Sequence, residues 1–261
     1  MPELPEVEFA VRRLRRLARG RTVVALNVHH PSQRRQLRSR AIRRVTDRRI
    51  IAVERRGKHQ LLCLDDGAIL LVHFRMNGDW EYTRATDALP PHTRVSLDLS
   101  GGRRVSLTDS RALCTVRWCA PGALPDLGLG PEPEDPALTG AALRARLAGR
   151  RGPIKPALLD QALVAGVGNI YAAEACWHAR IHPAARASRL SLQRVTRLLD
   201  ALRATLSDGH ENARRQSRGE RQIPFEVYDR ALEPCSRCDA PIRRIAQAGR
   251  GTWYCPRCQR S

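Results

Sequence analysis

Lysine is almost absent from this 261-residue chain, although basic residues are abundant. Lys58 and Lys155 are the only lysines among 46 basic residues, which leaves 44 arginines. Because arginine supplies the positive charge everywhere else, we predict that these two positions require an amine. Methionine is equally rare. Met76 is the only methionine after the initiator, which predicts a need for a flexible apolar side chain at that position.

Long apolar runs are also missing. No segment has the roughly 20 apolar residues that a membrane helix needs, and the chain begins with acidic residues where a secretory signal would be basic. These absences predict a cytoplasmic protein with no membrane partner. Acidic residues number 26 against 46 basic ones, and the formal net charge is +20. Such a charge favours nucleic acid as a partner, with solubility or an arginine-biased genome as the alternative explanation.

The apolar pattern predicts a helix followed by strands. After Pro2, apolar residues recur at helical spacing from Val7 to Leu17, and Gly20 ends the pattern. The chain then changes, over about residues 22–118, to short β-rich runs separated by glycine-containing turns. The clearest runs are 50–53, 60–64 and 68–74. A β-sandwich is the expected assembly of such strands.

A proline-rich stretch marks a change from strands to helices. We expect a domain over 1–120, a linker over 121–136, a helical domain over 137–225 and a terminal module over 226–261. Thr139 is the expected cap of the first helix. The other expected helices are 155–163, 169–179 and 191–206. The polar, arginine-rich segment 209–221 is predicted to be a mobile loop.

Four cysteines near the end of the chain have the spacing of a metal site. Cys235, Cys238, Cys255 and Cys258 form a C-x2-C-x16-C-x2-C pattern, in which each close pair can give two thiolates to one tetrahedral ion. One structural Zn2+ ion is the expected cofactor, and iron in a rubredoxin-like site is the chemical alternative. The spacer fits a β-hairpin with Arg250 near its tip, where an arginine can reach a phosphate.

Three segments together resemble one protein family. Residues 1–8, MPELPEVE, residues 166–172, GVGNIYA, and the cysteine module resemble the formamidopyrimidine-DNA glycosylase and endonuclease VIII family of base-excision repair enzymes. The resemblance implies an α+β multidomain fold: an N-terminal β-sandwich flanked by helices, then a helical helix-two-turn-helix domain with a β-hairpin zinc finger. It also implies a monomer that binds duplex DNA with damaged bases or abasic sites in the cleft between the domains, associated with the bacterial nucleoid.

The resemblance assigns chemistry to the start of the chain. Pro2, freed by removal of Met1, would attack a sugar C1′ with its secondary amine, whose pKa allows an unprotonated fraction at neutral pH. Glu3 would transfer protons, while Glu6 has a structural role at the helix start. Lys58 would contact a phosphate near the lesion, and Arg250 would grip flanking phosphates and assist elimination. The alternative role of Pro2 is that of a first-turn helix proline.

Further residues match family positions that bind the DNA around a flipped nucleotide. Met76 and Arg111 would fill the void, and Leu113 stands where the formamidopyrimidine branch has an aromatic wedge. Core packing is the alternative role of Met76. The loop 209–221 is shorter than its counterpart in that branch. Both departures weaken the assignment to that branch.

The helical region adds two expected DNA-binding residues. Asn169 matches a phosphate-binding asparagine, with helix capping as a second role. Lys155 is also expected to bind DNA, because the tripeptide 154–156 resembles the formamidopyrimidine branch. Glu174 matches a family glutamate on the same helix as Asn169, for which we expect a structural or orienting role.

The interpretation that follows is a bifunctional DNA glycosylase and abasic-site lyase that acts through a proline Schiff base with β,δ-elimination. Oxidised or ring-opened purines are the expected substrates. The first alternative is an endonuclease VIII-like specificity for oxidised pyrimidines or other bulky lesions. The second is a zinc-dependent protein that binds damaged DNA without catalysis.

Overall fold

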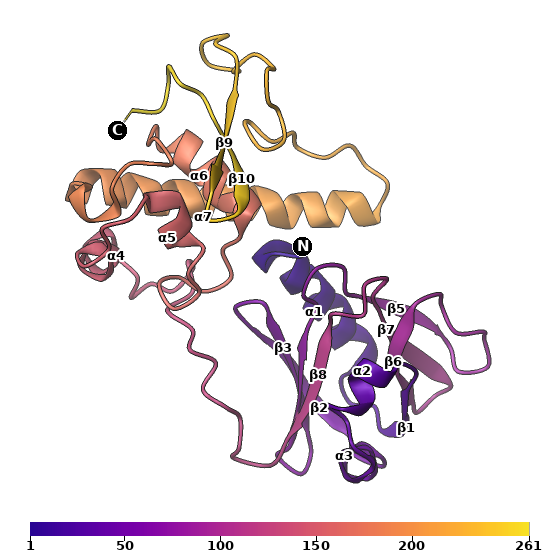
Figure 1. Cartoon of the computed structure of the whole chain (residues 1–261). Coiled ribbons are helices and arrows are strands. Elements are labelled where there is room, and N and C mark those ends of the chain that lie inside the picture. The colour runs from indigo at the N-terminus through magenta and orange to yellow at the C-terminus, as the bar shows by residue number, and fades with distance from the viewer. Residues whose placement is uncertain (261) are drawn as a thin grey trace. The chain divides into compact units, whose positions relative to one another are not determined.

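The computed structural model describes residues 1–260, and they form two compact units. One unit spans Met1–Leu127 and the other begins at Gly128, so the boundary falls inside the stretch expected to be a linker. Figure 1 colours the first unit indigo to magenta and the second pink to yellow. Among the described residues, no helix combines the length and the apolar character needed to cross a membrane.

The first unit is the expected β-sandwich with its helices, which confirms that part of the fold prediction. Its strands form two four-stranded antiparallel sheets, in the orders β1-β6-β7-β5 and β2-β3-β4-β8. Its helices are α1 (Leu4–Ala18), α2 (Pro31–Arg34) and α3 (Ser39–Val45). Its strands are β1 (Val23–Val28), β2 (Ile50–Arg56), β3 (His59–Leu64), β4 (Ile69–His73), β5 (Asp79–Arg84), β6 (Thr93–Leu99), β7 (Arg103–Thr108) and β8 (Thr115–Cys119).

One continuous core joins α1 to both sheets. The helix buries Val7, Val11 and Leu14 on one face, as their spacing predicts, among apolar side chains of the strands. One polar pair lies in this interior: Trp80 of β5 donates a hydrogen bond of 2.7 Å from Nε1 to Gln60 of β3. This pair links the two sheets, because β5 and β3 belong to different sheets.

The second unit is helical and ends in a two-stranded hairpin, as expected. Its helices are α4 (Gly140–Leu147), α5 (Ile154–Leu158), α6 (Asn169–His178), the short 3-10 helix η1 (Ala187–Arg189) and α7 (Leu192–Ser217). The hairpin consists of β9 (Arg243–Gln247) and β10 (Arg250–Tyr254). It packs on α6, where Ala173 and Trp177 share a small core with Ile242 and Trp253. Thr139 caps α4 by accepting a hydrogen bond from the backbone N–H of Ala142, as predicted.

The helix expected over 155–163 is shorter than predicted and ends at Leu158. Asp160 explains the difference. Its side chain accepts a hydrogen bond of 2.9 Å from the backbone N–H of Ala162, which stabilises a turn instead of another helical turn.

The prediction of a mobile loop over 209–221 is wrong. Residues 209–217 are the last turns of α7. Glu211 pairs there with Arg214 and Arg215, and the Asn212 side chain exchanges two hydrogen bonds with the backbone of Ile223. Gly209, the first residue of this segment, is a packing residue. A Cβ atom at this position would lie 2.4–2.6 Å from the ring of Tyr171 on α6.

We expect Gly209→Ala to destabilise the protein. The added methyl group must displace the buried Tyr171, which costs about 1–3 kcal/mol by overpacking. Chemical denaturation measures the free energy of unfolding. Gly149→Ala is the matched control, because a Cβ at Gly149 meets no atom within 4 Å. Equal stabilities of the two variants would contradict close packing of α6 on α7.

Candidate functional site

The first candidate group lies at the start of α1. Pro2 is partly exposed just ahead of the helix, and Glu3, the N-cap residue, is 2% exposed. The Glu6 carboxylate accepts a hydrogen bond of 2.8 Å from the backbone N–H of Glu3. This contact gives Glu6 a capping role, because it satisfies one of the free N–H groups at the helix start. Pro2 and Glu3 are therefore held at a rigid helix end.

Ion pairs and hydrogen bonds align α1 with β2. Arg15 donates a hydrogen bond of 2.8 Å to the carbonyl of Val53. About two helical turns earlier in α1, Glu8 accepts a hydrogen bond of 2.8 Å from Arg55, which lies two residues further along β2. This register directs the beginning of α1 toward the turn between β2 and β3, which carries Lys58. The side chain of Lys58 is buried, with 6% exposure.

Glu8 and Arg55 are positioning residues that the sequence analysis missed. Burial opposes ionisation of Glu8, but hydrogen bonds from Arg55 and Arg12 outweigh it and lower the pKa of Glu8. Arg55 also donates to the carbonyl of Gly57, next to Lys58, at 3.1 Å. The sequence held one signal for the role of Glu8. This acidic residue follows Glu3 by five positions in a helix rich in arginine, on the side of the helix that faces the strand.

Met76 lies on the turn between β4 and β5. Its side chain is 38% exposed, so the core-packing alternative does not hold. Gly78 makes the tight turn possible, because a Cβ there would lie 2.7 Å from the carbonyl oxygen of Phe74. On the other side, His73 Nδ1 accepts a hydrogen bond of 2.9 Å from the backbone N–H of Arg75. Burial, with nearby His59, Arg75 and Lys58, lowers the pKa of His73 to about 3, so this acceptor stays neutral at neutral pH.

Arg111 and Leu113 lie on the loop between β7 and β8. Both are exposed, Leu113 by 45%. Beneath them the buried Asp109 carboxylate accepts hydrogen bonds from three backbone N–H groups, those of Arg111 at 3.0 Å, Leu113 at 2.6 Å and Cys114 at 2.7 Å. These hydrogen bonds to the Asp109 carboxylate fix the backbone of the loop. The exposed side chains of Arg111 and Leu113 therefore start from defined positions. The anchoring role of Asp109 was not predicted from the sequence.

The loop of Leu113 also contacts the turn of Met76. The Asn77 side chain donates to the hydroxyl of Ser110 at 3.3 Å. Three exposed tips, Met76, Arg111 and Leu113, thus belong to one connected surface of the first unit.

In the second unit, a buried ammonium group joins α6 to the hairpin. Lys155 Nζ donates to Asn169 Oδ1 at 2.5 Å, to Thr252 Oγ1 at 2.7 Å and to the carbonyl of Gly251 at 3.2 Å. Asn169 Nδ2 donates to the same Gly251 carbonyl at 3.1 Å. Lys155 is fully buried, which does not fit the direct DNA contact that we expected of it. It acts instead as a positioning residue, because its three donors hold Asn169 against β10.

Arg250 begins β10 at the tip of the hairpin, exposed and next to Gly251. The Lys155 cluster therefore places Arg250 beside Asn169. The position near the tip agrees with the sequence analysis.

The four cysteines converge at the other end of the hairpin. Their sulfur atoms all lie within 4.8 Å of one another, with 3.5 Å between Cys238 and Cys255 and 4.0 Å between Cys235 and Cys258. Zinc–sulfur bonds of about 2.3 Å in a tetrahedron require sulfur separations of about 3.8 Å. The donor set and its geometry therefore fit one structural zinc ion.

Glu174 attaches the chain that enters this module to α6. Its buried carboxylate accepts hydrogen bonds of 2.8–3.0 Å from the backbone N–H groups of Glu226, Val227 and Tyr228. Burial raises the pKa of Glu174 against the opposing effect of these donors. The contacts give Glu174 an orienting role for the metal module.

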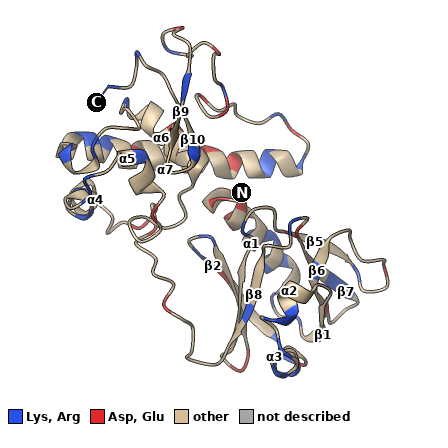
Figure 2. Cartoon of the chain, in the orientation of Figure 1, with Lys and Arg blue, Asp and Glu red and all other residues tan. Residues whose placement is uncertain are grey.

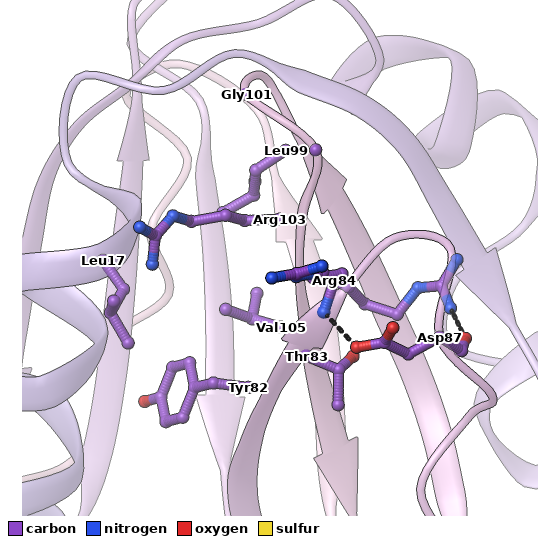
Figure 3. Close-up of a pocket in the computed structure, with 11 residues that line it drawn as sticks. Leu17, Tyr82, Thr83, Arg84, Asp87, Leu99, Gly101, Arg103 and Val105 are labelled. Carbon is purple, nitrogen blue, oxygen red and sulfur yellow. Dashed lines mark hydrogen bonds between the residues drawn. The ribbon is translucent and has the colours of Figure 1, made fainter.

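The first unit also contains a hollow of about 480 Å³, which is shown in Figure 3. Leu17, Tyr82 and Arg103 line it. Because Leu17 is near the end of α1, about 20 Å along the helix from Leu4, the hollow is not part of the group around Pro2.

Three family models match the chain in succession. A formamidopyrimidine-DNA glycosylase N-terminal domain matches residues 1–116, the helix-two-turn-helix domain of the same family matches residues 129–219, and a zinc finger found in formamidopyrimidine-DNA glycosylases and isoleucyl-tRNA synthetases matches residues 233–260. The last match confirms the zinc prediction.

Full-length relatives give the same result. A protein of Chloroflexus aurantiacus named formamidopyrimidine-DNA glycosylase is 40% identical, covering 99% of this chain and 98% of the relative. Its namesake in Erythrobacter litoralis is 38% identical and covers all of both chains.

Solved structures are similar over the whole chain. The Lactococcus lactis formamidopyrimidine-DNA glycosylase, bound non-covalently to DNA with an abasic site, has a TM-score of 0.91 at 28% identity, with full coverage of both chains. A related structure in complex with DNA containing carbocyclic 8-oxo-G has a TM-score of 0.90 at 30% identity, again with full coverage.

We expect Lys155→Met to weaken the attachment of the hairpin to α6. The variant keeps the apolar stem but removes the donor to the half-buried Asn169 oxygen and to the buried Thr252 hydroxyl, at a cost of about 1–3 kcal/mol for the buried group left unsatisfied. Amide hydrogen exchange of residues 250–254 should accelerate. Arg151→Met, at an exposed position of the same unit, is the control. Unchanged exchange in Lys155→Met would show that the ammonium does not hold the hairpin.

Proposed function

The chain belongs to the formamidopyrimidine-DNA glycosylase family, and on that premise we propose that it removes oxidised or ring-opened purines from duplex DNA and then cuts the abasic strand. The observation that carries the proposal is the placement of Pro2, partly exposed, ahead of a capped helix in a chain that matches the family from end to end. A single chain, acting on the chromosome, is the proposed working form.

The proposed chemistry begins at the amine of Pro2 once Met1 is removed. Its lone pair forms a bond to the sugar C1′ while the glycosidic bond breaks, and the damaged base leaves with that electron pair and takes up the proton that the Pro2 nitrogen loses. Glu3 protonates the ring oxygen, so the sugar opens and the nitrogen forms an iminium ion with C1′. Loss of a proton from C2′ then expels the 3′ phosphate, and a second elimination expels the 5′ phosphate. Water finally releases Pro2.

Other residues of this chain would bind and orient the DNA. We propose that Lys58, Asn169 and Arg250 bind phosphates around the lesion, with Arg250 assisting elimination. Lys155 would position Asn169 directly and Arg250 through the neighbouring residues Gly251 and Thr252, to which it donates hydrogen bonds. The zinc ion, held by the four cysteines, would supply only the rigidity of the hairpin, because four thiolates leave it no open coordination position.

The exposed tips of the first unit suit the gap left by a flipped nucleotide. Met76 and Leu113 would replace its stacking, and Arg111 would face the unpaired base. Leu113 stands where the branch has an aromatic wedge, and a smaller apolar tip favours a second candidate specificity, for oxidised pyrimidines or other bulky lesions.

Borohydride trapping on DNA with an abasic site tests the catalytic proposal. Reduction should fix the iminium ion, so that the protein stays covalently joined to the strand, and mass spectrometry should find the adduct on an N-terminal peptide that begins with Pro2. We expect Pro2→Gly to lose most of the adduct. Pro121→Gly, the same replacement at an exposed position far along the chain, should retain it.

Two results would count against this mechanism. A mature protein that retains Met1 would have no free Pro2 amine. A protein that binds abasic DNA tightly but never forms the adduct would instead be a zinc-dependent damage-binding protein without catalysis.

Arg250→Ala should weaken incision and flatten the salt dependence of DNA binding. Loss of one phosphate contact lowers the slope of log K against log salt concentration by about 0.9. Arg243→Ala is the matched control, because Arg243 is an exposed arginine at the opposite end of the same hairpin. Identical incision rates and slopes for Arg250→Ala and the wild type would remove Arg250 from the site.

A further inference from the structure

A second concentration of positive charge lies at the end of the zinc finger that carries the two cysteine knuckles, the turns of Cys235–Cys238 and Cys255–Cys258. Six arginines and one zinc ligand line a hollow of about 520 Å³ in the second unit. The lining residues are Arg180, Arg194, Arg197, Arg237, Arg257, Cys258 and Arg260. They come from the end of α6, the start of α7 and the two cysteine knuckles, where Lys and Arg are blue in Figure 2.

This charge is not neutralised within the part of the chain that the structure describes. The second unit does form ion pairs, such as Arg150 with Asp160 and Arg215 with Glu211, but none involves the six arginines of the hollow. Burial and the neighbouring Arg197 lower the pKa of Arg194, as expected where like charges stand together. Such an arrangement is unfavourable unless an anion shares it.

Backbone carbonyls hold four of the guanidinium groups in place. Arg194 donates to the carbonyl of Arg260 at 2.7 Å, and Arg197 to that of Ala179 at 2.8 Å. Arg257 donates to the carbonyl of Cys238 at 3.1 Å. Each guanidinium has five N–H donors, so these contacts leave others for a ligand.

The fourth group, that of Arg237, is fixed twice. It donates to the carbonyl of Trp177 at 2.8 Å and lies 3.5 Å from the centre of the Trp177 ring. A guanidinium that is already ordered loses less entropy when it binds an anion.

The hollow is separate from the site around Arg250. Cys255 follows the five-residue strand β10, so the knuckles lie about 17 Å along the hairpin from Arg250 at its tip. One phosphate cannot contact both ends.

We propose that this hollow is a second phosphate-binding site, which takes phosphate groups of a DNA strand outside the segment that holds the lesion. Arginine forks match the oxygen pairs of phosphate, and several of them around one concave surface favour a polyanion over a single carboxylate. Contact with a second DNA segment would keep the enzyme near DNA while it searches. A free polyphosphate offers the same chemistry, and the experiment has separate arms that distinguish it from DNA.

The test compares two double variants of the full chain. Arg180→Gln/Arg260→Gln removes two charges from the hollow at side chains that make no hydrogen bond or ion pair within residues 1–260. Arg144→Gln/Arg189→Gln removes the same charge from exposed arginines outside it. None of these residues belongs to the proposed catalytic group, so incision of a short damaged duplex should be equal in both variants and the wild type.

The first arm uses inorganic triphosphate and calorimetry. The protein is first saturated with a short duplex that carries a stable abasic-site analogue, so that the site around Arg250 is filled. Wild type and control should bind triphosphate. The hollow variant should bind it with an affinity lower by about tenfold, as expected for the loss of charge-assisted hydrogen bonds. The second arm measures binding of a long undamaged duplex against salt, where the slope should fall by about 1–2 in the hollow variant alone.

Each result decides the proposal. A smaller slope in the duplex arm assigns the phosphates to DNA, and a loss confined to the triphosphate arm assigns a free polyphosphate. Equal behaviour of the two double variants in both arms would overturn the site. Oligoglutamate that binds as tightly as triphosphate, with the same loss in the hollow variant, would overturn the preference for phosphate. A wild type that fails to incise would count against the proposed function but leave both arms measurable.

Discussion

The buried ammonium of Lys155 is the contact on which the proposed phosphate-binding residues of the second unit depend. A charge removed from water is tolerable only when its donors are satisfied, and here three oxygens accept from three N–H groups. Those oxygens belong to Asn169 and to two residues of β10, so the cost of desolvation is offset only while the hairpin lies against α6. Zinc stiffens the hairpin, and Lys155 determines where the stiff hairpin is attached.

The first unit uses buried anions for the same purpose. Asp109 collects three backbone N–H groups beneath Leu113, and Glu8 holds Arg55 beside the turn of Lys58. In each case an internal charge fixes backbone geometry, and an exposed neighbour becomes a tip with a defined position. Exposed side chains cannot order one another in this way, because water competes for their hydrogen bonds. The proposed chemistry therefore depends on buried charges that hold the exposed residues in place.

Periodicity and spacing were enough to predict the sandwich, most helices and the metal ligands. Two C-x2-C pairs can meet in a tetrahedral site around one ion without help from distant residues. The apolar residues of α1 lie on one face of the helix, so only that face can be buried. The end of α7 escaped prediction because the segment 209–221 is polar and arginine-rich, whereas its first residue, Gly209, leaves room for the side chain of Tyr171 from another helix. Glu8, Asp109 and the burial of Lys155 escaped for the same reason: each depends on a partner distant in sequence, which local pattern does not reveal.

The scarcity of lysine can now be given a physical cause at position 155. An ammonium has three donors, which match three acceptors in a pocket that excludes water. A guanidinium would bring five donors in a planar fork, and the unmatched N–H groups would be buried at a cost of about 1–3 kcal/mol each. At the surface that cost disappears, because water satisfies the remaining donors, and arginine can stand at almost every exposed basic position. Lys58 is also largely buried, with 6% exposure, so neither lysine belongs to the exposed basic residues of the chain.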